Sequence, residues 1–180
     1  MSKLAVIFAE SFEEIEAISV VDILRRAQVT VDMLGVGALS ITGSHGIEVA
    51  VDKLLSAVKA ADYDGVVLPG GLPGSFVLRD DALVQEFIIA CKGKLQAAIC
   101  AAPIALKQAG SLDGRLLTSH PSMESEFDSK YYLEKNVVID GKVVTSRGAG
   151  TSFDFVAGIL EVLGLESKVH ELRQAMLYPK

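Results

Sequence analysis

The sequence predicts one α/β domain, in which a mostly parallel sheet is covered by helices on both faces. The 180 residues, half of them hydrophobic, are enough for one core and too few for two. Short apolar runs typical of buried strands alternate with longer segments in which apolar residues recur every three or four positions. This alternation favours parallel strands joined by helices, with ligands bound beyond the carboxyl ends of the strands.

Each predicted element is bounded by turn residues. Short aliphatic runs predict buried strands at residues 4–9, 29–34, 65–68 and 95–99. Helical spacing predicts amphipathic helices at residues 13–27, 82–92, 101–109 and 152–163. Residues 39–41 and 47–51 are predicted as short antiparallel strands, as are 137–139 and 142–145, which Asp140-Gly141 joins in a hairpin turn. No repeat or linker interrupts the pattern, so residues 1–180 are expected to form a single domain.

Charge and cysteine content exclude several classes of protein. The net charge of −6 would repel a phosphate backbone, and no Lys/Arg cluster is visible along the sequence, so nucleic-acid binding is not expected. The first apolar run is too short for a signal peptide and no later stretch could cross a bilayer, which predicts a cytoplasmic protein away from membranes. Cys91 and Cys100 have no disulfide or metal-ligand spacing, so both are expected to be free thiols.

Cys100 is the candidate reactive residue. It lies in Ala97-Ala98-Ile99-Cys100-Ala101-Ala102-Pro103, where a buried strand is predicted to turn into a helix. Unpaired amides and the dipole at a helix N-terminus favour a thiolate, so the pKa of Cys100 is expected to be lowered. A small buried core cysteine is the alternative. Cys91, near the end of a predicted helix, is expected to serve packing alone.

A candidate acid follows the first strand. Ser11-Phe12-Glu13-Glu14 has the pattern of a capping box, in which Ser11 and Glu14 begin the helix and Glu13 faces the helix dipole. Glu16 falls on a mainly apolar flank of that helix, where burial would raise the pKa of its carboxyl group. A carboxylic acid protonated near neutrality can donate a hydrogen bond to a thiolate or move a substrate proton. The alternative is a solvent-facing helix glutamate.

The glycine-rich segment 69–74 follows the third buried strand. Its glycines let backbone amides approach a ligand, so Gly70 and Gly71 are candidate binding residues. We expect the amides of Gly71 and Ala101 to form an oxyanion site; a plain strand-to-helix turn is the alternative. His120 lies on a loop that could overhang this edge and supply a base.

The remaining candidates have weaker links to Cys100. His45 and His170 show no geometric relation to it, and three scattered histidines form no metal-ligand pattern, so no metal is predicted. Arg147 lies in a turn before the last long helix, where it could pair with a carboxylate, lock the loop or contact substrate.

The chain resembles the DJ-1/PfpI family over nearly its whole length. Four segments carry the resemblance: EEIE at 13–16, VLPGG at 67–71, AICAAP at 98–103 and TSRGAGTSF at 145–153. It implies a flavodoxin-like three-layer sandwich and a homodimer. It also implies that Cys100 is the nucleophilic, oxidation-sensitive cysteine, Glu16 its protonated carboxyl partner and His120 the nearby imidazole, with Gly71 and Ala101 as amide donors.

One position departs from the pattern of many close relatives. His45 stands where they carry an arginine that reaches the neighbouring subunit's site. An imidazole is shorter than a guanidinium group and neutral over much of the physiological range, so it binds an anion less well.

The resemblance implies a glutathione-independent glyoxalase III-type lyase, or a deglycase, acting on methylglyoxal, glyoxal or their glycated adducts without a cofactor. Two alternatives use the same cysteine. One is an oxidative-stress sensor or chaperone, in which Cys100 is oxidised to a sulfinic acid that Glu16 stabilises. The other is a cysteine peptidase or amidase, which would need a carboxylate to orient His120.

Overall fold

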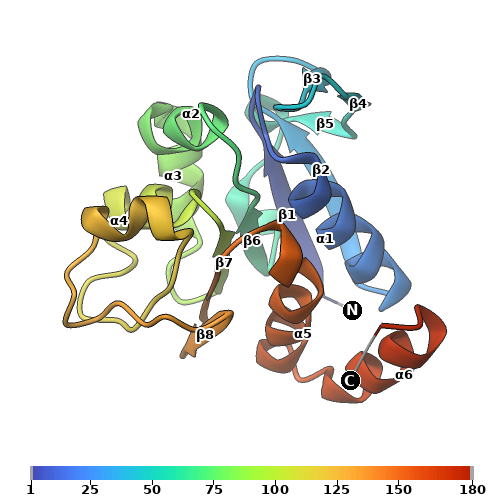
Figure 1. Ribbon diagram of the computed structural model, residues 1–180. Coiled ribbons are helices and arrows are strands. Elements are labelled where there is room, and N and C mark those ends of the chain that lie inside the picture. The colour runs from blue at the N-terminus through green and yellow to red at the C-terminus, as the bar shows by residue number, and fades with distance from the viewer. Residues whose placement is uncertain (1, 179–180) are drawn as a thin grey trace.

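A seven-stranded sheet in the order β5-β2-β1-β6-β7-β9-β8 forms the centre of the molecule in the computed structural model, which describes residues 2–178 (Figure 1). All neighbouring strands run parallel except the β8–β9 pair. The strands of this sheet are β1 (Lys3–Phe8), β2 (Thr30–Gly35), β5 (Lys53–Leu54), β6 (Gly65–Leu68), β7 (Leu95–Ile99), β8 (Val137–Asp140) and β9 (Val143–Ser146).

Helices cover both faces, as Figure 1 shows. On one face lie α1 (Glu14–Arg26) and α5 (Ser152–Val162), with α6 (Glu166–Ala175) beside α5. On the other lie α2 (Gly74–Asp80), α3 (Ala82–Ala90) and α4 (Pro103–Gln108). The predicted α/β class, a mostly parallel sheet in a flavodoxin-like three-layer sandwich, is therefore confirmed.

Strand β1 shows why the sheet has two cores. Successive side chains of a strand point to opposite faces. Leu4, Val6 and Phe8 join the apolar cluster under α1 and α5. Ala5 and Ile7 join the cluster under α3 and α4. Because helices cover both faces of β1, side chains on both of its faces are buried, and its sequence is therefore apolar at almost every position.

The structure differs from the predicted elements at β9, at α2 and at β5. β9 was expected to be an antiparallel addition, but it pairs parallel with β7 and belongs to the main sheet; only β8 is antiparallel. The predicted hairpin of β3 (Ser40–Thr42) and β4 (Glu48–Ala50) is present as a separate sheet. Helix α2 and strand β5 were not predicted, because both are too short to show a periodic pattern. Across residues 2–178, no helix has the length and apolar character needed to cross a membrane.

Short 3-10 turns complete the fold at Leu55–Ala57, Ala60–Asp62, Pro121–Glu126 and Ala149–Thr151.

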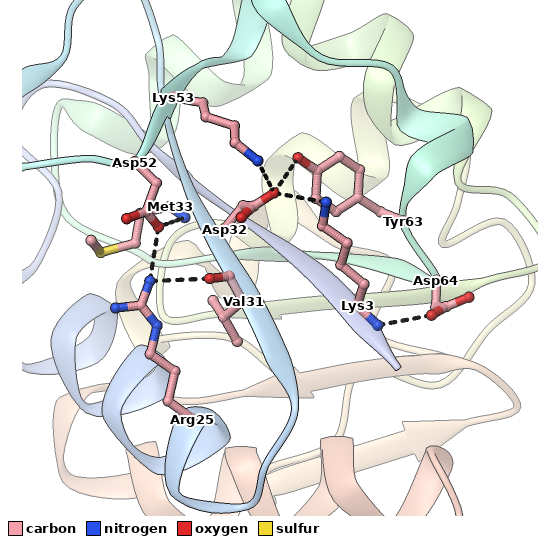
Figure 2. Close-up of polar contacts among 9 residues, drawn as sticks. All are labelled: Lys3, Arg25, Val31, Asp32, Met33, Asp52, Lys53, Tyr63 and Asp64. Atoms are coloured by element: carbon pink, nitrogen blue, oxygen red, sulfur yellow. Dashed lines mark hydrogen bonds and ion pairs between the residues drawn. The ribbon is translucent and has the colours of Figure 1, made fainter. Parts of the chain in front are cut away.

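A polar network fastens the amino-terminal end of the sheet, as Figure 2 shows. Asp32 of β2 accepts hydrogen bonds from Lys53 Nζ (2.7 Å) and Tyr63 Oη (2.8 Å), and Lys3 Nζ lies 3.0 Å away. Burial alone would raise the pKa of Asp32, but the hydrogen bonds from these partners outweigh burial and lower it to about 2. The ionised carboxylate thus links β1, β2, β5 and the loop before β6.

Replacing this carboxylate should destabilise the protein in a pH-dependent way. We expect Asp32→Asn to lower the melting temperature at pH 7 by roughly 2–4 °C, the effect of about 1 kcal/mol in a domain of this size. Because folding lowers the pKa of Asp32, its ionised form stabilises the folded protein at every pH above the unfolded pKa, near 4. This stabilisation is lost as the pH falls through about 2, the pKa in the folded protein. Thermal unfolding between pH 7 and pH 2 measures this. The exposed Asp62→Asn serves as control; an equal effect of both variants at every pH would contradict the assignment.

Candidate active site

Cys100 lies directly after β7, in a backbone conformation that side chains rarely adopt. Its φ is 63°, in the left-handed region. The Cys100 amide donates to Ser146 O at the end of β9 (2.9 Å), and the Cys100 carbonyl accepts from the His120 amide (2.8 Å). Two neighbouring segments therefore hold this strained turn in place. Helix α4 begins three residues later, at Pro103, so Cys100 precedes its first turn.

Glu16 lies in the first turn of α1 and is almost fully buried, with 1% of its surface exposed. Its Oε2 accepts a hydrogen bond from the Gly70 amide (2.8 Å), and its carboxyl group is hydrogen-bonded to the Cys100 side chain. Its Oε1 has no hydrogen-bond partner among residues 2–178. Burial is the main reason that the pKa of Glu16 rises to about 7. Glu16 is therefore a buried residue of the helix, as predicted, and not a solvent-facing one.

The predicted capping box is wrong, and the true cap explains how Glu16 is positioned. Helix α1 starts at Glu14, and its N-cap is Glu13, whose Oε2 accepts from the Glu16 amide (2.7 Å). Ser11 lies outside the helix with a φ of 65°. The signal was present in the sequence as Glu13 and Glu16 at the N-cap to N3 spacing. This signal is weak, because glutamate is an uncommon N-cap residue.

The glycine loop after β6 makes room for the pair. A Cβ on Gly70 would lie 2.5 Å from Glu16 Oε2 and 2.6 Å from Cys100 Cβ, so no side chain fits there. The Gly70 amide donates to Glu16 Oε2, so in this structure it supports the acid, and its role in binding substrate stays a prediction. The amides of Gly71 and Ala101 are hydrogen-bonded to the Cys100 side chain. These two donors therefore face the reactive sulfur.

The predicted lowering of the Cys100 pKa is wrong while Glu16 is ionised. Burial, followed by the charge and the hydrogen bond of Glu16, raises the pKa of Cys100 to about 12, although the amides of Ala101 and Gly71 act in the opposite direction. The sequence showed a strand-to-helix turn but could not show how little water reaches the sulfur. The two groups interact strongly, so they titrate as a pair.

His120 is exposed and lies at the edge of this site. Its Nδ1 is 2.8 Å from Ser122 Oγ, and no carboxylate orients the ring among the described contacts. A Cβ on Gly148 would lie 3.6 Å from His120 Cδ2 and 4.0 Å from Glu16 Oε1. The imidazole and the unpartnered carboxyl oxygen thus flank the same small space, which Gly148 leaves free. Neither Ser122 nor Gly148 was singled out from the sequence; His-Pro-Ser at the start of a turn was the available signal for Ser122.

The structure links His45 to a different carboxylate. Its Nδ1 lies 2.8 Å from Oε2 of the buried Glu14, and its amide donates to Glu14 Oε1 (2.6 Å). Burial alone would raise the pKa of Glu14, but these bonds lower it to about 2 and raise the pKa of His45. Ligand-type atoms of Glu13, Glu14 and His45 lie within 4.8 Å of one another, a proximity that the sequence did not reveal.

The contacts found for two other predicted residues do not involve the Cys100–Glu16 pair. Arg147 Nη1 is 3.9 Å from Glu134 Oε2, which fits the expected pairing with a carboxylate. Cys91 is fully buried in the apolar cluster under α3 and α4, as its expected packing role requires. Burial raises the pKa of Cys91 to about 11.

Comparison with known proteins identifies the family. The model of the DJ-1/PfpI family matches residues 2–162, almost the whole chain. The chain belongs to the DJ-1/PfpI family. Protein dj-1beta of Drosophila melanogaster is 40% identical over 183 residues, and the alignment covers 98% of both chains. The glutathione-independent glyoxalase DJR-1.2 of Caenorhabditis elegans is 31% identical over 182 residues, with 99% of this chain and 97% of that protein covered.

Solved structures of the DJ-1/PfpI family agree with the fold. The structure of oxidized Toxoplasma gondii DJ-1 superposes with a TM-score of 0.96 at 34% sequence identity, and all of both chains is covered. The glutathione-independent glyoxalase DJR-1.2 shows that at least one similar protein carries the name of an enzyme.

Gly70→Ala tests whether the close contact assembles the site. The added methyl group has no room between Glu16 and Cys100, so the loop must shift and the carboxyl group must leave the sulfur. We expect at least a tenfold change in the rate of Cys100 alkylation by iodoacetamide and a loss of roughly 1–3 kcal/mol of stability. Gly150→Ala is the matched control, because nothing lies within 4 Å of a Cβ at that position. Unchanged alkylation in Gly70→Ala would show that the contact is dispensable.

Proposed function

We propose that this protein is a glutathione-independent glyoxalase that converts methylglyoxal into lactate and glyoxal into glycolate. The observation that carries the proposal is the contact between the Cys100 side chain and the buried carboxyl group of Glu16, with two backbone amides on the sulfur. A nucleophile, a proton carrier and fixed hydrogen-bond donors are the groups that this rearrangement needs. The glyoxalase relative supports the reaction class.

The pair supplies the nucleophile as a shared single negative charge. With Glu16 ionised, its charge and hydrogen bond hold the proton on sulfur. With the proton on Glu16 instead, that repulsion disappears and the carboxyl group donates to a thiolate. Both arrangements have the same net charge, so moving one proton along the hydrogen bond exposes the reactive form without burying a second charge.

The proposed reaction begins when the Cys100 thiolate adds to the aldehyde carbon of methylglyoxal. A carbon–sulfur bond forms, the carbonyl π electrons move to oxygen, and Glu16 gives its proton to that oxygen to leave a hemithioacetal. The resulting carboxylate removes the hydrogen of the former aldehyde carbon as a proton, which leaves an enediolate. The hydroxyl proton on the first oxygen passes to the second, so that the negative charge comes to lie on the oxygen next to sulfur. Glu16 then delivers the proton that it took from carbon to the neighbouring carbon, which gives the thioester of lactate on Cys100.

Hydrolysis completes the cycle. Water adds to the thioester carbonyl, the carbon–sulfur bond breaks, and lactate leaves while the Cys100–Glu16 pair recovers its proton. The aldehyde carbon is oxidised and the ketone carbon is reduced within one molecule, so water is the only co-reactant in the scheme. His120, beside the space above Gly148, is suited to guide the water or to carry a proton to solvent.

The other functions considered from the sequence differ in what the site offers them. Removal of glycated adducts would start with the same thiolate addition, so it is a second substrate class for one chemistry. Oxidation sensing is favoured by the partial exposure of Cys100, which lets peroxide reach the sulfur. A peptidase is disfavoured, because Ser122 and not a carboxylate is the partner of His120 Nδ1.

Methylglyoxal consumption without glutathione distinguishes an enzyme from a sensor. We expect the wild-type protein to form many equivalents of lactate per chain, Cys100→Ser to form none above background, and Cys91→Ala to retain full activity. Cys91 is the matched control because it is the second cysteine and lies buried away from the site. If wild-type protein consumes at most one equivalent, the glyoxalase proposal fails and single-turnover oxidation of Cys100 becomes the better description.

The coupled pair predicts the pH dependence of the thiol. Raising the pH through about 7 removes one proton from the doubly protonated pair and creates the shared negative charge. Alkylation of Cys100 by iodoacetamide, followed by mass spectrometry in a Cys91→Ala background, should therefore accelerate with an inflection near pH 7.

In Glu16→Gln the inflection near pH 7 should disappear, and glyoxalase turnover should fall by about 100-fold or more because the proton carrier is missing. The amide side chain keeps the volume and can still accept from Gly70. An unchanged inflection in Glu16→Gln would assign it to another group.

A further inference from the structure

A basic cavity lies at the end of the sheet opposite Cys100. It has a volume of about 450 Å³ and is formed by the turn after α3, the turn after α4 and the β8–β9 hairpin. Its wall includes Lys94, which precedes β7, whereas Cys100 follows β7. At about 3.3 Å per residue of strand, the two sites are roughly 20 Å apart. The cavity is therefore separate from the candidate active site.

Four cations and one carboxylate line this cavity. The cations are those of Lys92, Lys94, Arg115 and Lys142, and the carboxylate is that of Asp113. In a chain with a net charge of −6, such a concentration of positive charge at one concave place is unexpected. A concave site lined by charges of one sign focuses the electric field and attracts an oppositely charged ligand.

The four cations differ in how many hydrogen-bond acceptors and carboxylates of the protein they already contact. Lys94 Nζ donates to the carbonyls of Ala60 and Tyr63, and Arg115 pairs with Asp140 at 3.2 Å. Lys142 Nζ donates only to the Gly93 carbonyl (3.0 Å), so its charge has no anionic partner within the described chain. No hydrogen bond or ion pair of the Lys92 side chain is found among residues 2–178, although Lys92 Nζ and Asp113 Oδ2 lie 3.5 Å and 3.3 Å from the position of a Cβ on Gly110. At least two positive charges thus face the cavity without a counter-charge bound to them.

A buried hydroxyl gives a second, independent sign of a missing ligand. Ser111 lines the cavity and is 6% exposed, and its Oγ has no hydrogen-bond partner among residues 2–178. An unsatisfied buried hydroxyl destabilises a fold, so such groups are uncommon without a function. A ligand acceptor atom in the cavity would give this hydroxyl a partner.

We propose that this cavity binds a small molecule through a phosphate group. A phosphate dianion supplies negative charge for Lys92 and Lys142, which have no anionic partner in the described part of the chain, and its oxygens supply a hydrogen-bond acceptor for Ser111. The cavity's volume exceeds that of inorganic phosphate alone, which suits a phosphorylated small molecule. A nucleic-acid duplex would instead need an extended basic face, and this positive charge is confined to one hollow.

Titration of labelled protein with inorganic phosphate and with pyrophosphate, followed by amide NMR shifts, tests this proposal. We expect saturable shifts at Gly93, Gly110 and Ser111 for both probes. Lys92→Gln should weaken binding by at least tenfold, since a charge-assisted hydrogen bond to phosphate is lost. Lys135→Gln removes one exposed lysine outside the cavity and should leave the affinity unchanged.

Ser111→Ala separates ligand binding from a structural role. It should weaken phosphate binding several-fold while leaving the melting temperature of the ligand-free protein unchanged or raised, because an unpartnered hydroxyl is removed. Shifts confined to Gly71 and Ala101 would place the anion at Cys100 and overturn the proposal. So would the absence of saturable shifts, or an equal loss of affinity in Lys92→Gln and Lys135→Gln.

Discussion

The burial of one carboxyl group, that of Glu16, organises this end of the molecule. A carboxyl group with 1% exposure is tolerated only if its hydrogen bonds are supplied by the protein. The Gly70 amide supplies one, the Cys100 side chain a second, and Glu13 fixes the helix turn from which Glu16 projects. The glycine after β6 follows from the same constraint, because any side chain there would separate the acid from the sulfur.

This burial also decides the electrostatic character of the site. Low exposure raises the pKa of both Glu16 and Cys100, so the pair is reluctant to carry two charges and readily carries one. A group that holds a proton near neutrality and releases it through a hydrogen bond is suited to reversible proton transfer. The strained backbone at Cys100 is kept by its bonds to Ser146 and His120, so the fold maintains a geometry that costs stability locally.

The features that could be predicted from the sequence depend on the local pattern of residues. Those that could not be predicted depend on segments that are distant in the chain and meet only in the fold. Residues 65–68 and 95–99 were predicted to the residue, since apolar runs between turns leave little ambiguity. The parallel pairing of β9 with β7 was missed because a hairpin signal describes only the β8–β9 contact. The raised pKa of Cys100 arises from side chains distant in sequence, and the helix cap used a glutamate where serine is the familiar signal.

The basic cavity at the other end of the strands also depends on segments that are distant in the chain. Its cations come from three turns that are far apart in the chain, so no charge cluster is visible in the sequence although one exists in space. The turns converge because β7 and β9 are parallel neighbours, and this register also brings Ser146 beside Cys100 at their far ends. One strand pair thus positions an acidic, proton-holding site and a cationic one. Strand β7 separates the two sites along its whole length, since Lys94 precedes it and Cys100 follows it, so the cavity is lined by residues that take no part in the Cys100–Glu16 pair.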